Sequence, residues 1–164
     1  MDARSGSMGT SVAAERSLTQ ALWLALLVPA GLLAGAIGSE VFGGLNPCEM
    51  CYWQRYGHWV GLTFATLALL LPKARRTLLL LAALGIAVSG AIGVYHAGVE
   101  AGWWEGFTTC TATGARSLQD ILRTPLVRCD QVQWTFLGLS MAAWNAILSL
   151  SAAGAIAWLT WRRR

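Results

Sequence analysis

Charged side chains are scarce in this sequence. Only 12% of the 164 residues are Asp, Glu, Lys or Arg, whereas 55% are hydrophobic, and the mean hydropathy is +0.52. A soluble domain carries charge at about a quarter of its positions. The shortage excludes a protein that covers a water-facing surface with its own polar groups, and it points to a membrane.

Charge is nearly absent from four long segments, which hold only Glu40 and Arg55. Crossing the hydrocarbon core takes roughly 20 apolar residues in a helix. The sequence therefore predicts an all-α membrane protein, in which residues 17–161 form a single four-transmembrane-helix bundle. The expected spans are residues 18–40, 51–71, 77–98 and 134–160, with a disordered tail at 1–16 and a basic tail at 162–164.

Basic residues are unevenly distributed between the two sides of this bundle. Eight of the twelve Lys and Arg residues lie near the termini or in the short 72–76 connection. Cytoplasmic loops collect Lys and Arg, so we expect both termini in the cytoplasm and the loops at 41–50 and 99–133 outside. The positive charge is divided among three separate chain ends, which argues against a nucleic-acid surface.

Cysteine is absent from the cytoplasm-facing segments. The four cysteines, Cys48, Cys51, Cys110 and Cys129, all fall on the expected outer side, where an oxidising compartment lets disulfides persist. Structural zinc often uses two CxxC pairs, but this chain has only one, so no metal is expected. From the residues alone the CxxC pair can still be a metal ligand, a static disulfide or an electron carrier.

The CxxC pair stands at the start of the second expected span. Asn46 suits a helix N-cap and Pro47 the first helical position. Cys48 would then lie in the opening turn, where unpaired N–H groups and the helix dipole lower the pKa of a thiol. Three-residue spacing on a helix also brings the Cys48 and Cys51 sulfurs within disulfide range.

A polar stripe continues from the CxxC pair into the second span. At 100° per residue, Cys48, Cys51, Arg55 and His58 share one side of a helix. Arg55 would stabilise a thiolate or a reduced quinone oxygen, unless it snorkels to the headgroups. His96 stands at a similar depth in the third span, where it would hold a quinone ring or relay protons. Both histidines also suit simple structural hydrogen bonds.

The second outer loop, at residues 99–133, contains one further helical pattern. Residues 117–126, SLQDILRTPL, place apolar side chains at helical spacing between polar ones. They predict a short amphipathic helix, lying on the membrane surface or packed on the bundle. Glu100 at the root of this loop is expected to be solvated.

Several motifs together resemble one family. PCEMCYWQR at residues 47–55 matches a P-C-x-x-C-x-x-(Q/E)-R run at the head of a second span. TTC and RCD supply a pair of loop cysteines, and QWTFLGLSMAAWNA at residues 133–146 is similar to a W-x-F-L-G-L-x-M opening of a fourth span. With YHAGVE followed by WW, this combination resembles the disulfide-bond-formation protein B (DsbB) family of the bacterial inner membrane.

The resemblance implies a quinone-dependent oxidase of a soluble periplasmic dithiol protein of the thioredoxin-fold, DsbA-like kind. Carried onto this chain, Cys110 is the sulfur attacked by the partner, and Cys129 then exchanges with the Cys48–Cys51 disulfide through Cys48. Cys51 is released as the thiolate that faces the quinone, with Arg55 beside it. The quinone is ubiquinone or menaquinone.

Two other functions remain possible from the sequence. An enzyme of the vitamin K epoxide reductase type also has four spans and two cysteine pairs, but there the CxxC pair comes late in the chain, whereas here it comes early. A membrane scaffold with static disulfides would show no turnover, and an arginine inside a span argues against it.

Overall fold

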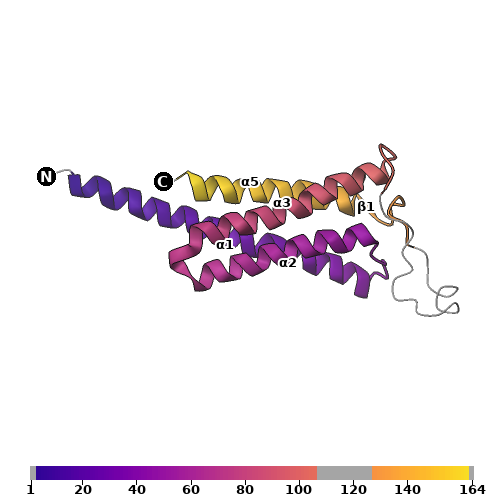
Figure 1. Cartoon of the computed structure of the whole chain (residues 1–164), viewed down its shortest axis with the longest axis horizontal. Coiled ribbons are helices and arrows are strands. Elements are labelled where there is room, and N and C mark those ends of the chain that lie inside the picture. The colour runs from indigo at the N-terminus through magenta and orange to yellow at the C-terminus, as the bar shows by residue number, and fades with distance from the viewer. Residues whose placement is uncertain (1–2, 107–126, 163–164) are drawn as a thin grey trace.

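Four long helices run along one common axis in the computed structural model, which describes residues 3–106 and 127–162 (Figure 1). A short 3₁₀ turn and a two-stranded hairpin connect some of them. In chain order the elements are α1 (Ala3–Val41), α2 (Glu49–Leu70), η1 (Pro72–Ala74), α3 (Arg75–Glu100), β1 (Thr135–Phe136), β2 (Leu139–Ser140) and α5 (Met141–Trp161).

The two ends of the bundle carry different parts of the chain. The starts of α1 and α3 and the end of α5 lie at one end, together with η1 (Figure 1). The α1–α2 connection, the end of α3 and the β1–β2 hairpin lie at the other end. Both chain termini are therefore at the end opposite the head of α2, where the CxxC pair stands.

Three of the described helical segments are long and apolar enough to cross a membrane: Val12–Val41, Pro72–Glu100 and Met141–Trp161. At 22 residues, α2 is about 33 Å long, which suffices for a crossing. Its composition does not qualify, because Gln54, Arg55 and other polar residues interrupt it. The expectation of four long helices is confirmed, whereas the passage of α2 through the membrane stays a prediction.

Helix α1 differs from expectation at its start. The sequence predicts a disordered tail over residues 1–16, but α1 is helical from Ala3. No proline precedes Pro29, and the run AAER at residues 13–16 consists of residues with high helix propensity. The helix is therefore continuous from the expected tail into the expected first span.

Helix α5 begins later than the predicted fourth span. Residues 134–140 were expected to be helical, but β1 and β2 pair in antiparallel register, with Thr135 opposite Ser140. The intervening turn has positive φ at Leu137 (52°) and Gly138 (78°), as two-residue hairpin loops require. Ser140 then caps α5, its hydroxyl accepting a hydrogen bond from the Ala143 N–H at 3.2 Å. The amphipathic helix predicted at residues 117–126 lies outside the described residues.

Small residues let α2 and α3 approach closely. A Cβ atom added to Gly57 would lie 2.9 Å from the Ser89 nitrogen, and one added to Gly85 would lie 2.9 Å from the Gly61 nitrogen. Such contacts are typical of helix pairs in membranes, where close backbone packing replaces the hydrophobic effect. Gly93 plays the same part against α5, since its added Cβ would lie 3.0 Å from the Ala142 carbonyl oxygen.

This packing predicts opposite outcomes for two glycine substitutions. Gly85→Ala forces α2 and α3 apart and should destabilise the fold by about 1–3 kcal/mol, as overpacking does. Gly154→Ala on α5 adds its methyl group to open space and should be neutral or stabilising by up to about 1 kcal/mol. Thermal unfolding of both variants in detergent micelles measures this. Equal effects would contradict the close approach of α2 and α3.

Candidate functional site

The CxxC pair lies at the N-terminus of α2, but the helix starts later than predicted. Cys48 is the N-cap residue, with an extended backbone (φ −78°, ψ 174°). Its side chain makes no capping hydrogen bond to the first turn of α2. Asn46 does not cap the helix. Its carbonyl oxygen instead accepts a hydrogen bond from Gln133 Nε2 at 2.8 Å. This bond ties the segment before Cys48 to the chain that follows Cys129, so helical geometry begins at Glu49.

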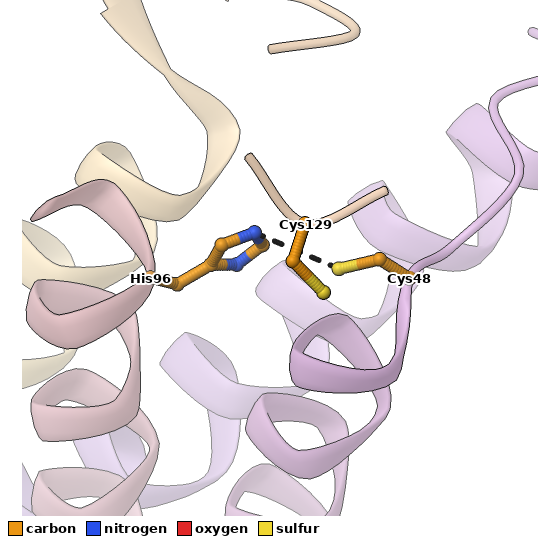
Figure 2. Close-up of side chains that lie close together, drawn as sticks. All are labelled: Cys48, His96 and Cys129. Carbon is orange, nitrogen blue, oxygen red and sulfur yellow. Dashed lines mark hydrogen bonds between the residues drawn. The ribbon is translucent and has the colours of Figure 1, made fainter. Parts of the chain in front are cut away.

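Three sulfur atoms gather at this helix start. Cys48 Sγ lies 3.2 Å from Cys51 Sγ, so the predicted proximity of the pair is confirmed. Cys48, Cys129 and His96 present side-chain atoms that all lie within 4.8 Å of one another (Figure 2). Cys48 and Cys129 are buried, and no disulfide joins any two of the three described cysteines. The fourth predicted site cysteine, Cys110, lies outside the described residues.

The environment of Cys48 opposes the predicted effect of the helix N-terminus. The sequence predicts a lowered pKa for this thiol. Instead, hydrogen bonding to the Cys129 and Cys51 side chains, together with burial, raises the pKa of Cys48 above its ordinary value. A hydrogen-bond donor that faces other sulfurs is stabilised in its protonated form. Cys48 is therefore a protonated thiol at neutral pH when all three cysteines are reduced.

The raised pKa of Cys48 predicts how the rate of its alkylation depends on pH. A raised pKa means that the thiolate fraction, and with it the alkylation rate, keeps increasing with pH beyond the ordinary thiol value of 9.0. In Cys129→Ala the midpoint of the profile should move to lower pH, because the hydrogen bond between the Cys48 thiol and the Cys129 side chain, the main cause of the raised pKa, is removed. Mass spectrometry of iodoacetamide-treated, fully reduced protein gives the rates. A wild-type midpoint below 9.0 would contradict this description of the site.

His96 is held between the sulfur cluster and a polar residue of α2. Its Nε2 atom lies 3.6 Å from Cys48 Sγ, and its Nδ1 atom lies 2.9 Å from Gln54 Nε2. The Gln54 amide donates to Nδ1, so a neutral ring carries its proton on Nε2, facing Cys48. The histidine can therefore supply a proton to, or accept one from, the atoms gathered at Cys48.

Glu100 joins the same group, contrary to expectation. The sequence suggested that it is solvated, but its side chain is only 9% exposed, and its Oε1 atom lies 3.8 Å from His96 Nε2. The other carboxylate oxygen is buried and has no hydrogen-bond partner among the described residues. The sequence spacing could have predicted this contact, because His96 and Glu100 are four residues apart and such residues share one face of a helix.

A chain of hydrogen bonds continues from His96 into the bundle. Asn145 Nδ2 donates to Gln54 Oε1 at 2.7 Å, and Asn145 Oδ1 lies 2.8 Å from His58 Nε2. Ser89 Oγ lies 3.0 Å from the same His58 nitrogen. We did not identify Gln54, Asn145 or Ser89 as site residues from the sequence. They could have been found as polar residues within otherwise apolar helices, because such residues usually face the interior of the bundle.

Arg55 connects α2 to α1. Its Nη1 atom lies 2.6 Å from Glu40 Oε2, and its Nη2 atom donates to the Ala36 carbonyl oxygen at 3.1 Å. The guanidinium also lies over the Tyr52 ring, 5.3 Å from the ring centroid. The arginine side chain is 14% exposed and that of Glu40 34%. Within the described residues, the positive charge beside the CxxC pair is therefore paired with a carboxylate of α1.

The Glu40–Arg55 ion pair predicts that Glu40→Gln lowers the stability of the fold more than a substitution in an exposed ion pair does. Glu40→Gln leaves Arg55 largely buried and unpaired, which should cost about 1–3 kcal/mol, between the values for exposed and for buried pairs. Glu15→Gln is the matched control, because Glu15 is 71% exposed and lies 3.7 Å from Arg75; its effect should stay below about 1 kcal/mol. Thermal unfolding in detergent measures both. A smaller effect for Glu40→Gln than for Glu15→Gln would show that the α1–α2 pair adds no stability.

A cavity of about 550 Å³ opens beside the sulfur cluster. This volume lies within the usual range for organic ligands and cofactors. Its wall brings together all the predicted site residues that the structure describes except Cys129: Cys48, Cys51, Arg55 and His96. His58, which the helical stripe placed with them, also lines it. The rest of the wall includes glycine, alanine and leucine residues of α1 and two aromatic residues, Trp134 and Trp144.

The fold and the site define a helical bundle with membrane-length helices and a thiol–histidine cluster at one end, next to a cavity. A family model described as "Disulfide bond formation protein DsbB" matches residues 18–159. This match covers most of the chain and all four cysteines. The chain therefore belongs to the DsbB family.

Individual relatives agree with this assignment. A protein of Aromatoleum aromaticum is 33% identical, over 88% of this chain and 95% of its own length. One of Nitrosomonas europaea is 32% identical, over 86% and 92%, and one of Xanthomonas campestris is 31% identical, over 76% and 79%. Each carries the name "Disulfide bond formation protein B". No solved structure matches the chain.

Proposed function

We propose that this protein generates disulfide bonds by oxidising a periplasmic dithiol protein of the thioredoxin-fold, DsbA-like kind and passing the electrons to a membrane quinone. Membership of the DsbB family supports the disulfide-forming part. The single observation that supports the electron path is the contact of Cys48 with both Cys51 and Cys129. Cys48 is thus in reach of a sulfur on either side, as a thiol–disulfide relay requires.

The relay starts from a chain in which Cys110 pairs with Cys129 and Cys48 with Cys51. A thiolate of the partner attacks Cys110, which breaks the first disulfide and frees Cys129. The second thiol of the partner then attacks the mixed disulfide, so that the partner leaves oxidised and Cys110 is released. Cys129 attacks Cys48, and Cys51 leaves as a thiolate. Cys110 then attacks Cys129, which re-forms the Cys110–Cys129 disulfide and releases Cys48 as the second thiol beside the cavity. These exchanges move two electrons from the partner to the cysteines beside the cavity.

The residues around the cavity suit a quinone. Its wall is mostly apolar, and Arg55 and His96 supply a cation and a ring N–H for oxygen atoms at the edge of a ring. When bound, a quinone such as ubiquinone or menaquinone supplies a sink for the two electrons and two protons that are lost as cysteine thiols re-form a disulfide. Arg55 stabilises the Cys51 thiolate, and His96 handles a proton at Nε2 next to Cys48.

The arrangement of the bundle supports a defined orientation in the bacterial inner membrane. The termini lie at the end opposite the described cysteines (Figure 1), and eight of the twelve basic residues belong to that end by sequence. The proposal therefore places the termini in the cytoplasm and the cysteines in the periplasm. In this proposal α2 also crosses the membrane, as the second of four spans, and it turns Gln54, Arg55 and His58 toward the cavity rather than toward lipid.

The test follows quinone reduction by absorbance when the purified protein is mixed with a reduced DsbA-like oxidase and excess quinone. Cys51→Ser should abolish turnover, and Arg55→Ala should lower it by roughly a hundredfold, as loss of a preorganised charge does. Arg75→Ala is the matched control, because Arg75 begins α3 at the opposite end of the bundle, and it should leave turnover unchanged.

Two outcomes would point to other functions. Absence of turnover with both quinones, with all cysteines stably paired, would favour a scaffold with static disulfides. Quinone reduction that is driven by a small-molecule dithiol but not by the DsbA-like protein would favour an enzyme of the vitamin K epoxide reductase type.

A further inference from the structure

We propose that the reduced protein binds a soft d¹⁰ metal ion, Zn²⁺ in the first place, through Cys48, Cys129 and His96. The sequence analysis expected no metal, because zinc sites commonly draw on two CxxC pairs and only one is present. In the structure the three donors come from separate places: the N-cap of α2, the chain after residue 127, and the last turns of α3 (Figure 2). The missing second pair is therefore replaced by a loop cysteine and a histidine.

The distances between the donors fit such an ion. Zinc lies about 2.3 Å from a thiolate sulfur and about 2.0–2.1 Å from an imidazole nitrogen, with tetrahedral angles. Two such donors are then about 3.6 Å apart, and Cys48 Sγ lies 3.6 Å from His96 Nε2. The Cys129 donor is within 4.8 Å of both, so a modest side-chain rotation completes a three-donor face.

The charge of the site also fits. Zn²⁺ displaces the protons of the Cys48 and Cys129 thiols, and both protons go to solvent, while no electrons are transferred. Two thiolates then neutralise the two charges of the ion, which suits a buried place where an unbalanced charge is costly. Thiolate and imidazole together are the donor set that zinc prefers.

Two further groups are near enough to complete the coordination. Cys51 Sγ lies 3.2 Å from Cys48 Sγ, and Glu100 Oε1 lies 3.8 Å from His96 Nε2. The second oxygen of Glu100 is buried and has no hydrogen-bond partner within residues 3–106 and 127–162, so a cation nearby would give this polar atom a partner. Either group can take the fourth position of a tetrahedral ion.

Gln54 acts in the outer shell. Without a metal, His96 Nδ1 accepts a hydrogen bond from Gln54 Nε2. Coordination of an ion at Nε2 moves the ring proton to Nδ1, which then becomes a donor. Rotation of the Gln54 amide by half a turn exchanges its nitrogen and oxygen, so that the oxygen accepts from the protonated Nδ1. The Asn145 amide, which donates to the Gln54 oxygen at 2.7 Å, has to rotate with it. Outer-shell partners of this kind orient the ring and raise its affinity for the metal.

Metal binding and disulfide chemistry exclude each other at Cys48, because one sulfur cannot form both bonds. The ion therefore holds the protein in its reduced form and blocks the exchange between Cys129 and Cys48. This consequence, though not the binding itself, rests on the proposed function. Zinc would act as a reversible inhibitor of the re-oxidation of the cysteines.

The experiment loads full-length protein in detergent with ZnCl₂ and measures retained zinc by elemental analysis after gel filtration. The protein is first reduced and freed of reductant without air, and a parallel sample is fully oxidised. We expect about one Zn²⁺ per reduced chain and close to none per oxidised chain. Co²⁺ in place of Zn²⁺ should give thiolate-to-metal charge-transfer absorption in the reduced sample alone.

Variants locate the site. His96→Ala and Cys129→Ser should each weaken zinc binding by about a hundredfold or more, since loss of an outer-shell partner alone costs about 10–100-fold. His58→Ala is the matched histidine control, because His58 faces Asn145 and Ser89 and lies outside the three-donor group. It should retain wild-type affinity.

Three results would overturn the proposal: no retained zinc in folded, fully reduced protein; equal zinc in the oxidised protein; or equal affinity in His96→Ala and wild type. Quinone reduction by zinc-free protein is measured separately. Zinc binding without turnover would leave the metal site standing and refute the proposed function, and turnover without zinc binding would do the reverse.

Discussion

Polar side chains that are buried between apolar helices must find their partners inside the bundle, because neither lipid nor a dry core offers hydrogen bonds. The bundle meets this constraint through Gln54. Its amide joins His96 of α3 to Asn145 of α5, with hydrogen bonds of 2.9 and 2.7 Å. One side chain of α2 thus ties together three helices, and it also sets the orientation of the histidine ring that faces Cys48.

The glycine contacts make this tie possible. Gly57 and Gly61 of α2 lie against α3 with no room for a side chain, so the backbones come close enough for Gln54 to reach His96. On its other side α2 is joined to α1 by Arg55 and Glu40. Of the four long helices described, α2 is the one that is not apolar enough to qualify as a membrane span, and its polar residues make the contacts that join it to the other three.

Regular spacing explains what could be predicted from the sequence. The scarcity of charge predicts the long helices, and three-residue spacing predicts the contact of Cys48 with Cys51. Helical periodicity likewise predicts that Arg55 and His58 share one side of a helix with them, and in the structure all four line the cavity. Each of these inferences depends only on the geometry of one helix, which the sequence specifies directly.

The errors have a different physical origin, namely contacts between residues distant in the chain. The pKa of Cys48 was predicted from the helix end alone, yet the neighbouring Cys129 and Cys51 reverse its direction. Glu40 is fifteen residues from Arg55, and no local rule selects it as the partner. The start of α2 was misplaced for the same reason, since Asn46 is held by Gln133, eighty-seven residues further on.

The position of Cys48 shows why one site can serve both electron transfer and metal binding. A sulfur that exchanges with two others must lie in contact with both, and a nearby histidine must be free to take or give a proton. These requirements gather two thiols and an imidazole at distances that also suit a tetrahedral ion. The redox state of the cysteines decides between metal binding and disulfide exchange, because a disulfide removes the thiolates that bind a metal. In the proposed relay, Cys48 is therefore protected from metal ions whenever it is part of a disulfide.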